Sequence, residues 1–255
     1  MADRLEIIGL PGVPMVQPGD NLGALAISVL VDADIAPEAG DVLVVAQKIV
    51  SKAENRFVDI ATVTPSAQAR KLAAETGKDP RFVEVVLSES KRIVRHRENL
   101  IIAEHRLGFV MANAGIDHSN VAPGDGRNLV LLLPVDPDGS ARALREELVA
   151  AYGVPIAVIV SDSFGRPWRR GTVGIALGAA GLPAIIDWRG RPDLFGRALE
   201  VTETGFADEI AAAASLVMGQ ADEAMPMVLV RGLAWTAPEA DAAALVRPPE
   251  HDLFR

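Results

Sequence analysis

The stretch that most constrains the fold of this chain is an apolar run that ends abruptly in polar residues. Residues 156–160, Ile-Ala-Val-Ile-Val, lead directly into Ser161, Asp162 and Ser163. A continuous run of mainly β-branched residues is typical of a strand buried on both faces of its sheet. The carboxyl end of such a strand is a common position for a ligand in sheets covered by helices. The run therefore predicts a layered protein, with Asp162 and Ser163 emerging at the edge of its core.

The residues after this strand have the chemistry of a metal–phosphate site. Asp162 supplies an anionic oxygen and Ser163 a neutral one, a pairing that suits Mg²⁺ or Mn²⁺. Arg166, Arg169 and Arg170 place guanidinium groups nearby that can hold phosphate or carboxylate oxygens. The simpler alternative is a strand-end aspartate that caps a turn beside solvated arginines. The stretch alone favours neither interpretation, because Asp and Ser are ordinary turn residues.

Composition narrows the class of protein. With 255 residues, 49% of them hydrophobic and 4% aromatic, the chain can build one large domain or two small ones around an aliphatic core. The absence of cysteine excludes disulfides, thiolate zinc sites and a cysteine nucleophile, and it fits the cytoplasm, where we expect the protein to act. We expect no signal peptide and no membrane span. The net charge of −9 argues against general nucleic-acid binding, so an anionic ligand requires local arginines, lysines or metal ions.

Two further segments carry candidate ligand groups. A second buried strand is predicted at residues 42–46, and it is followed by Gln47, Lys48 and Lys52, whose lysines could neutralise phosphate. A solvated alternating strand is the simpler interpretation, and the residues by themselves favour it. The pattern GxxxxGK[ST] is absent from the sequence, so these lysines do not belong to a P-loop.

Asp117 and Asn120 are the second candidate pair. They lie three residues apart in a predicted loop or first helical turn. One of them could bind a cation while the other hydrogen-bonds a base, a ribose or a phosphate. An Asx turn explains the same residues at least as well, so the pair remains open at this point.

Hydrophobic periodicity predicts further strands and helices along the chain. Residues 129–134, 141–152 and 156–162 are expected to form a strand, a helix and a strand, which suggests a βαβ-like unit ending at Asp162. Residues 172–181 are rich in glycine and alanine, which permits close packing of a helix against another element. Other strands are predicted at 4–10, 184–188, 199–204 and 227–231, a hairpin at 100–110, and helices at 21–31, 64–74, 80–87 and 206–217.

No repeat or linker marks a domain boundary in the sequence. We therefore expect residues 1–236 to form one domain, or two closely joined subdomains, and residues 237–255 to form a loose carboxyl-terminal tail. The basic stretch 88–97 could grip an acidic ligand, although an exposed charged element is the commoner explanation.

Five motifs in one order resemble the coenzyme F420-0:L-glutamate ligase family. The resemblance extends from Leu5 to about Arg231, and five ordered motifs are far more specific than any one of them. The motifs are Gly9–Pro11, Gln47–Glu54, Ala114–Val121, Leu133–Pro137 and Ser161–Arg169.

The resemblance implies a fold and an activity. The implied fold is α+β, with mixed sheets, packed helices and no P-loop, assembled as an intertwined homodimer. The implied reaction is a GTP-dependent addition of L-glutamate to coenzyme F420-0 through an amide bond, by way of an acyl phosphate, after which γ-linked glutamates can follow. The resemblance also implies two Mg²⁺ or Mn²⁺ ions per site and a monovalent cation such as K⁺, which no residue of this sequence locates.

The same resemblance implies roles for individual residues. Asp117 and Asp162 would hold one divalent ion, and Ser163 and Gln220 would serve a second. Arg166 and Arg169, together with Arg189, are hypothesised to hold the acidic substrates. The residues expected to contact GTP are Leu10, Pro11, Gly12, Val13, Gln47, Lys48, Lys52, Asn120, Met218, Gly219, Gln220, Ala221, Asp222, Glu223, Ala224 and Met225.

Three other functions stay compatible with the same residues. A metal-dependent phosphohydrolase could use the same carboxylates, and it would release phosphate from GTP alone. A non-catalytic nucleotide-binding protein is the second alternative. It would have no enzymatic activity, so Asp162→Ala would change none. A ligase acting on a different acid is the third, because the metal motif does not encode the acceptor pocket.

Overall fold

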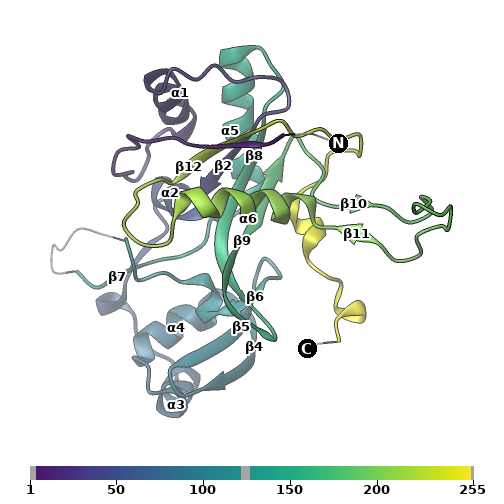
Figure 1. Cartoon of the computed structure of the whole chain (residues 1–255). Coiled ribbons are helices and arrows are strands. Elements are labelled where there is room, and N and C mark those ends of the chain that lie inside the picture. The colour runs from purple at the N-terminus through teal and green to yellow at the C-terminus, as the bar shows by residue number, and fades with distance from the viewer. Residues whose placement is uncertain (1–3, 122–126, 254–255) are drawn as a thin grey trace.

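The computed structural model of the chain describes residues 4–121 and 127–253. Its architecture is mixed α+β, as the sequence predicts, with one central sheet and a smaller lobe beneath it (Figure 1). Within the described ranges, no helix is both long enough and apolar enough to cross a bilayer.

A five-stranded mixed sheet forms the centre of the molecule, in the order β1–β12–β2–β8–β9. β2 and β8 are parallel, and the other neighbouring pairs are antiparallel. The strands are β1 (Glu6–Gly9), β12 (Met227–Arg231), β2 (Val42–Ala46), β8 (Ala157–Arg166) and β9 (Arg169–Ala180).

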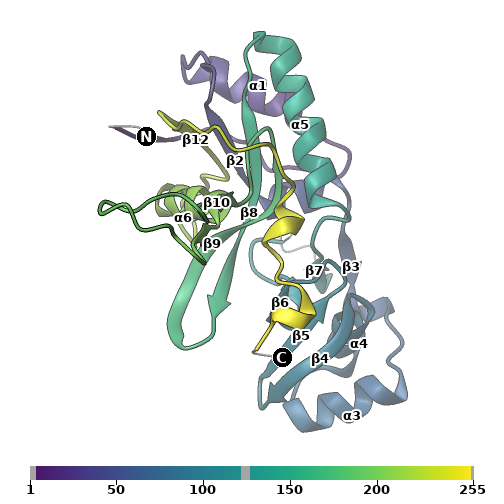
Figure 2. The ribbon, with the colours of Figure 1, turned by 90° about the vertical axis from the view of Figure 1, so that its right-hand side faces the viewer.

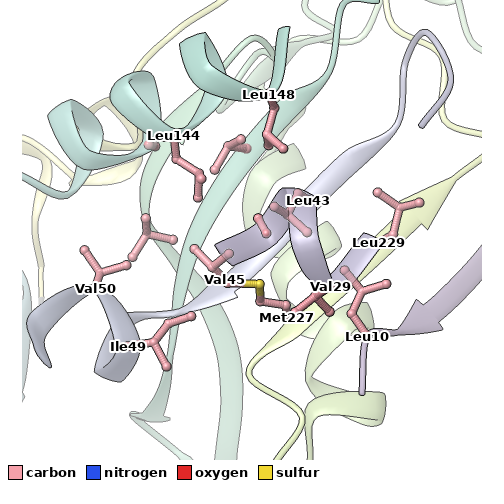
Figure 3. Packing of buried hydrophobic residues seen from close by; sticks show 14 of the residues in the cluster. Leu10, Val29, Leu43, Val45, Ile49, Val50, Leu144, Leu148, Met227 and Leu229 are labelled. Carbon is pink, nitrogen blue, oxygen red and sulfur yellow. The ribbon is translucent and has the colours of Figure 1, made fainter. Parts of the chain in front are cut away.

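Helices cover both faces of this sheet (Figure 2). α1 (Leu22–Asp32) and α5 (Pro137–Tyr152) pack on one face, and α6 (Phe206–Met218) packs on the other. In β2, Leu43 and Val45 face α1 and α5, whereas Val42 and Val44 face α6. β8 alternates in the same way over residues 157–160, so the predicted burial of this run on both faces is confirmed. Figure 3 shows the first of these two cores, in which Leu43 and Val45 meet side chains from α1, α5 and β12.

Local sequence explains where these helices begin and end. Asn21 caps α1 by accepting a hydrogen bond from the Ala24 amide at 2.8 Å, and Asp136 caps α5 by accepting one from Gly139 at 2.9 Å. Gly219 follows α6 with a positive φ of 71°, which favours glycine, and its amide donates to the Ser215 carbonyl.

The second lobe consists of residues 57–121 and 127–132 and has a core of its own. Two helices, α3 (Ala67–Thr76) and α4 (Pro80–Ser88), pack on an antiparallel sheet of β4 (Ser90–Arg97), β5 (Leu100–His105) and β6 (Val110–Ala112). A short antiparallel pair, β3 (Phe57–Asp59) and β7 (Leu129–Leu131), completes the lobe. The basic stretch 88–97 is therefore mostly the edge strand β4.

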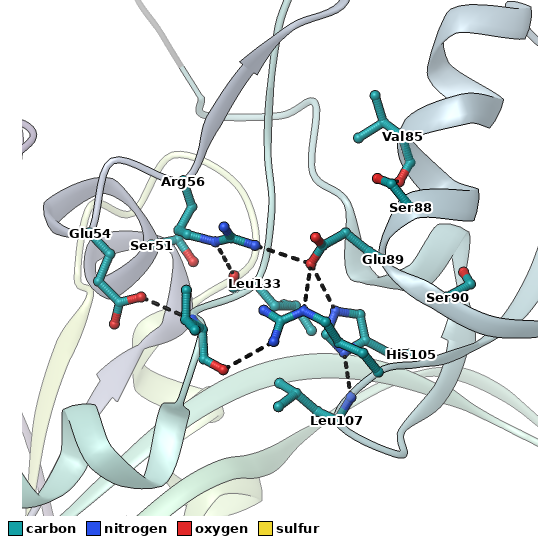
Figure 4. Close-up of polar contacts among 12 residues, drawn as sticks. Ser51, Glu54, Arg56, Val85, Ser88, Glu89, Ser90, His105, Leu107 and Leu133 are labelled. Atoms are coloured by element: carbon teal, nitrogen blue, oxygen red, sulfur yellow. Dashed lines mark hydrogen bonds and ion pairs between the residues drawn. The ribbon is translucent and has the colours of Figure 1, made fainter. Parts of the chain in front are cut away.

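A buried carboxylate joins the second lobe to the rest of the chain (Figure 4). Glu89 Oε2 lies 3.1 Å from Arg56 Nη2, 3.1 Å from Arg106 Nε and 3.3 Å from His105 Nε2. The two arginines also donate to backbone carbonyls in the segment 133–135 that leads to α5. Burial alone would raise the pKa of Glu89, but the hydrogen bonds of His105 and Arg106 and the charges of both arginines lower it to about 2.

Three local predictions are wrong. β7 pairs with β3 in the second lobe and not with β8, so residues 129–162 form no βαβ unit. Residues 47–53 form a helix, α2 (Gln47–Ala53), and not an alternating strand. Residues 161–166 continue β8, which forms a long hairpin with β9, so the arginine-rich stretch is a hairpin and not a turn after the strand.

The glycine- and alanine-rich segment 172–181 belongs to strand β9, and its glycines bring helices close to the sheet. A Cβ atom on Gly174 would lie 2.4 Å from the Ala211 carbonyl oxygen of α6, and one on Gly178 would lie 2.1 Å from the Pro137 carbonyl oxygen of α5. Close helix packing was therefore predicted correctly, although the small residues lie on the strand.

The carboxyl-terminal segment is docked and not loose. Asp138 of α5 accepts hydrogen bonds from the amides of Ala242 and Ala243, at 2.8 and 3.3 Å, and also from Ala179 of β9 at 2.8 Å. Ala242 is completely buried. The segment runs from the central sheet down past the second lobe (Figure 2).

Two short strands form an arm beside the central sheet. β10 (Ile186–Asp187) and β11 (Glu203–Thr204) pair at its base, and the segment between them projects away from the body (Figure 1).

Candidate active site

The candidate site lies where two parallel strands reach the edge of the central sheet. The register of β2 and β8 places Ala46 opposite Ser161. β2 ends at Ala46, so β8 continues past its neighbour with one edge uncovered from Asp162 onward. The prediction that Asp162 and Ser163 lie at the carboxyl end of the strand is wrong, because β8 continues to Arg166, but both residues line the cavity described below.

Asp117 reaches this edge from the second lobe. Its amide and carbonyl exchange two hydrogen bonds with Leu131, each 2.9 Å long. Its Oδ2 atom accepts a hydrogen bond from Gln47 Nε2 at 2.7 Å and lies 2.6 Å from Lys48 Nζ. Since Gln47 and Lys48 open α2 directly after β2, the end of β2 connects the central sheet with the second lobe.

Asp162 lies close enough to Asp117 for their charges to interact. Burial and the negative charge of Asp117 raise the pKa of Asp162 to about 7. Three weaker influences lower the pKa of Asp162. They are a hydrogen bond from the Ser163 amide at 2.8 Å, the positive charge of Lys48 and a hydrogen bond from the Gln47 side chain. A carboxylate whose ionisation is suppressed by burial and by a neighbouring carboxylate marks a place where a cation would be stabilised.

Lys52 adds a buried positive charge to the same site. Its side chain is only 8% exposed, and within residues 4–121 and 127–253 no carboxylate forms an ion pair with it. Burial, and to a smaller extent the charge of Lys48, lowers the pKa of Lys52. Lys52 lines the cavity described next, and a mostly buried positive charge that no carboxylate balances would be stabilised by an anionic ligand.

Gln47, Lys48, Lys52 and Asp162 line a cavity of about 500 Å³, whereas Asp117 is not among its lining residues. That volume suits a small-molecule ligand. Lys48, Lys52 and Asp162 contribute its charged wall, and the loop after α6 forms the opposite side. Asn120 links this loop to the second lobe, because its Nδ2 donates to the Ala221 carbonyl at 3.0 Å.

Comparison with known proteins identifies the family. Residues 12–232 match the family model described as F420-0:Gamma-glutamyl ligase. The chain belongs to the F420-0:gamma-glutamyl ligase family. It is 48% identical over 253 residues to the coenzyme F420:L-glutamate ligase of Methanothermobacter thermautotrophicus, covering 98% of this chain and 99% of that relative. It is also 46% identical to the ligase of the same name from Methanopyrus kandleri, covering 98% of both chains.

Most of the residues expected to contact GTP in this member of the family line the cavity described above. Val13, Gln47, Lys48, Lys52 and Asn120 line the cavity, as do all eight residues of the loop from Met218 to Met225.

Three of the residues expected to contact GTP lie elsewhere. Leu10 is completely buried in the core, with its amide donating to the Met227 carbonyl at 3.0 Å. Pro11 and Gly12 are exposed and do not line the cavity, although Val13 immediately after them does.

The arginines of the family member's fifth motif lie on the β8–β9 hairpin, outside the cavity lining. Arg166 and Arg169 face each other at its tip in the strand register. Arg166 is half-buried, and its Nη1 atom is buried without a hydrogen-bond partner in the described part of the chain, whereas Arg169 is exposed. The guanidinium group of Arg189 is already paired within the chain. Its Nη2 atom lies 2.6 Å from Asp187 Oδ2 and 3.2 Å from Glu203 Oε1.

Several cavity residues were not predicted from the sequence. No sequence pattern around Gly174 of β9 or Ser215 of α6 identifies these residues as part of a site. They line the cavity because α6 packs on β9. Ser161 and Ala46 are adjacent to predicted residues at the two strand ends. The other unpredicted lining residues are Pro14, Met15, Val16, Ile49 and Pro226.

The residues present fit a divalent ion bound together with a phosphorylated ligand. Asp162, Ser163 and Gln220 line the cavity, and Asp117 is held beside Gln47 and Lys48, so the donors are the oxygen ligands that Mg²⁺ and Mn²⁺ prefer. No group of three or more His, Asp or Glu side chains stands together within residues 4–121 and 127–253. An ion here would therefore complete its coordination with neutral protein oxygens, water and the ligand's phosphates, as Mg²⁺ commonly does.

Proposed function

We propose that this protein attaches L-glutamate to coenzyme F420-0 through an amide bond in a GTP-dependent reaction. The observation that carries the proposal is a carboxylate pair, of which Asp162 lines the cavity, beside the mostly buried Lys52, which also lines it and forms no ion pair within residues 4–121 and 127–253. The carboxylates would be stabilised by cations and the lysine by an anion. A triphosphate with bound metal ions supplies both kinds of charge. The names printed for the relatives, coenzyme F420:L-glutamate ligase, supply the two substrates to be joined.

The proposed reaction has two steps. A carboxylate oxygen of the F420-0 lactyl group attacks the γ-phosphorus of GTP, and GDP leaves. The amine of L-glutamate then attacks the carbonyl of the acyl phosphate, phosphate leaves, and the amine loses a proton. Further γ-linked glutamates would follow by the same chemistry.

Residues of the chain would contribute mainly positioning and charge neutralisation, which suffice for phosphoryl transfer. Lys48 and Lys52 would hold phosphate oxygens, and Asp117, Asp162, Ser163 and Gln220 would hold two divalent ions. Those ions would neutralise charge that develops on the phosphates. A monovalent cation such as K⁺ belongs to the same proposal without an assigned residue.

Arg166 is the arginine best suited to hold an acidic substrate. Its buried Nη1 atom lacks a partner, which is unfavourable for a cationic group unless a ligand supplies one. Arg169, opposite it on the hairpin, would assist from a more exposed position.

A homodimer is the assembly we propose for the intact protein. The arm between β10 and β11 exposes Leu194 and Phe195 almost completely, at 98% and 95%, and the β8–β9 hairpin exposes Trp168 at 88%. Large apolar side chains gathered on projecting segments are typical of a surface that another chain covers. Both segments leave the body of the molecule, as an intertwined arrangement requires (Figures 1 and 2).

Mass spectrometry tests the proposal directly. F420-0 incubated with the protein, GTP, Mn²⁺ and L-glutamate should gain one or more glutamyl units, and omission of any component should prevent this. Asp162→Asn, which keeps the shape of the side chain and removes its charge, should lower the product roughly a hundredfold or more. Phosphate release from GTP without F420-0 would indicate a phosphohydrolase, and no product with GTP bound would indicate a non-catalytic nucleotide-binding protein.

A further inference from the structure

Gln47 makes a contact that depends on the orientation of its amide group. Its side chain is buried, with 1% of the residue exposed, and its Nε2 atom faces Asp117 Oδ2 at 2.7 Å. An ionised carboxylate only accepts hydrogen bonds, so the NH₂ end of the amide must face Asp117. The Gln47 oxygen must then point away from the carboxylates, into the protein.

Ser51 receives that oxygen. It lies one helical turn further along α2 and is completely buried, and its Oγ donates to Gln47 Oε1 at 3.0 Å. Without this hydroxyl, a buried amide oxygen would have no donor in the only orientation that suits Asp117, which is unfavourable.

The bond of Ser51 differs from the local bonds that most helical hydroxyls of the described chain make, although Ser140 of α5 also donates to a side chain, Glu54 Oε1, at 2.6 Å. Thr76, Ser88 and Ser215 each donate to a backbone carbonyl three or four residues earlier, which is the ordinary local bond of a helical Ser or Thr. Ser51 instead donates to the side chain of Gln47, which lines the cavity and contacts Asp117.

We infer that Ser51 is a positioning residue, which fixes the Gln47 amide so that Asp117 is held beside Asp162 in readiness for a divalent ion. The inference deepens the proposed function and rests on it. Ser51 touches neither substrate nor metal in this arrangement, and it acts through Gln47. Loss of the hydroxyl should let the amide rotate and should weaken cation binding before any chemistry occurs.

The test compares Ser51→Thr with Ser51→Val. The two side chains have nearly the same shape, so any strain from the added methyl group is shared, and only threonine keeps the hydroxyl. Binding of Mn²⁺ alone is measured by the loss of the free-ion electron paramagnetic resonance signal. The valine variant should bind Mn²⁺ roughly tenfold more weakly than the threonine variant, which should approach the unmodified protein.

Two further variants keep the result interpretable. Ser51→Ala removes the hydroxyl without added volume and should weaken Mn²⁺ binding as valine does. Thr76→Val removes an equally buried hydroxyl that bonds only to backbone, and it should leave Mn²⁺ affinity unchanged even if the protein melts at a lower temperature.

The outcomes separate the inference from the proposal beneath it. Equal Mn²⁺ affinity of the threonine, valine and alanine variants would overturn the role of Ser51 while leaving the proposed metal site intact. Absence of Mn²⁺ binding by the unmodified protein would overturn both.

Discussion

At the scale of single residues, the cavity already contains a positive charge where a metal ion is expected. Lys48 Nζ lies 2.6 Å from Asp117 Oδ2, and the pair is only partly exposed to solvent. An ammonium and a divalent ion cannot share one carboxylate oxygen at such distances without strong repulsion. A metal that binds Asp117 through this oxygen would displace Lys48, and the freed ammonium would then be available to a phosphate.

Lys48→Met should therefore change Mn²⁺ binding and GTP binding in opposite directions. Removal of the competing charge should strengthen Mn²⁺ binding in the absence of nucleotide by several-fold, because like charges in a partly buried site repel. The same substitution should weaken GTP binding roughly tenfold, because a charge-assisted hydrogen bond is lost. Calorimetric titration with each ligand checks both directions, and Lys71→Met, on the exposed face of α3, serves as the control. Weaker Mn²⁺ binding by the Lys48 variant would contradict the exchange.

At the scale of elements, the cavity depends on how closely helices approach β9. Gly174 and Gly178 lie where a side chain would collide with the backbone of α6 and α5. Backbone atoms cannot move aside as the end of a flexible side chain can, so these contacts set the distance between the layers. α6 leads directly into the loop that forms one side of the cavity, which connects this packing to ligand binding.

Gly178→Ala should destabilise the fold by about 3 kcal/mol, because its Cβ would lie 2.1 Å from the Pro137 carbonyl oxygen. The measurement is the midpoint of denaturant-induced unfolding. Gly165→Ala, in the partner strand of the same hairpin, meets no atom within 4 Å and should change stability little. Equal midpoints for the two variants would refute the close approach of α5 to β9.

At the scale of the whole molecule, the second lobe and the central sheet are joined by polar contacts, by an apolar cluster of Met111, Leu133, Phe164 and Leu177, and by the docked carboxyl-terminal segment. The Glu89 cluster connects the second lobe to the chain that leads into α5 (Figure 4). Asp117 belongs to one lobe and Asp162 to the central sheet, so the relative placement of the two parts determines whether the carboxylates meet.

The Glu89 cluster should make stability depend on pH. A pKa lowered from 4.5 to about 2 corresponds to about 3 kcal/mol of stability. This contribution is complete above about pH 4.5 and disappears as the pH falls toward 2, because the carboxylate must be ionised to pair with the arginines. Glu89→Gln should therefore be less stable than the unmodified protein at about pH 7, and the difference should shrink at about pH 3. Glu75→Gln, which breaks only a half-exposed pair with His96, should have little effect at either pH.

The proposed homodimer gives a prediction for the arm. Phe195→Asp should shift the protein from dimer to monomer, because it places a charge on the apolar tip that a partner chain would cover. Val31→Asp, an equal change at an exposed position of α1, should leave the dimer intact. Light scattering coupled to size-exclusion chromatography gives the mass of each variant, and a monomeric unmodified protein would refute the proposal.

Prediction from the sequence worked best where the controlling interactions are local or strongly periodic. The buried strand 42–46 was placed at its observed ends, and the helix 206–217 was placed to within one residue of them. The apolar run 156–160 was correctly predicted to form a strand, but the strand end predicted at Asp162 was wrong, because pairing with β9 extends β8 to Arg166. The grouping of Asp117 with Asp162 came only from the family resemblance, since no local pattern connects two segments that lie far apart in the chain.

The sequence by itself determined most of the elements, the two-faced burial of the central strands and the types of donor available to a ligand. Only the tertiary structure decided that residues 47–53 form a helix, because the buried Gln47 requires Asp117, 70 residues away, as its partner. The same holds for β7, whose partner is β3, and for the carboxyl-terminal segment, which the carboxylate of Asp138 holds in place. Buried polar groups need partners, and those partners are set by how distant segments pack and not by neighbours in the chain.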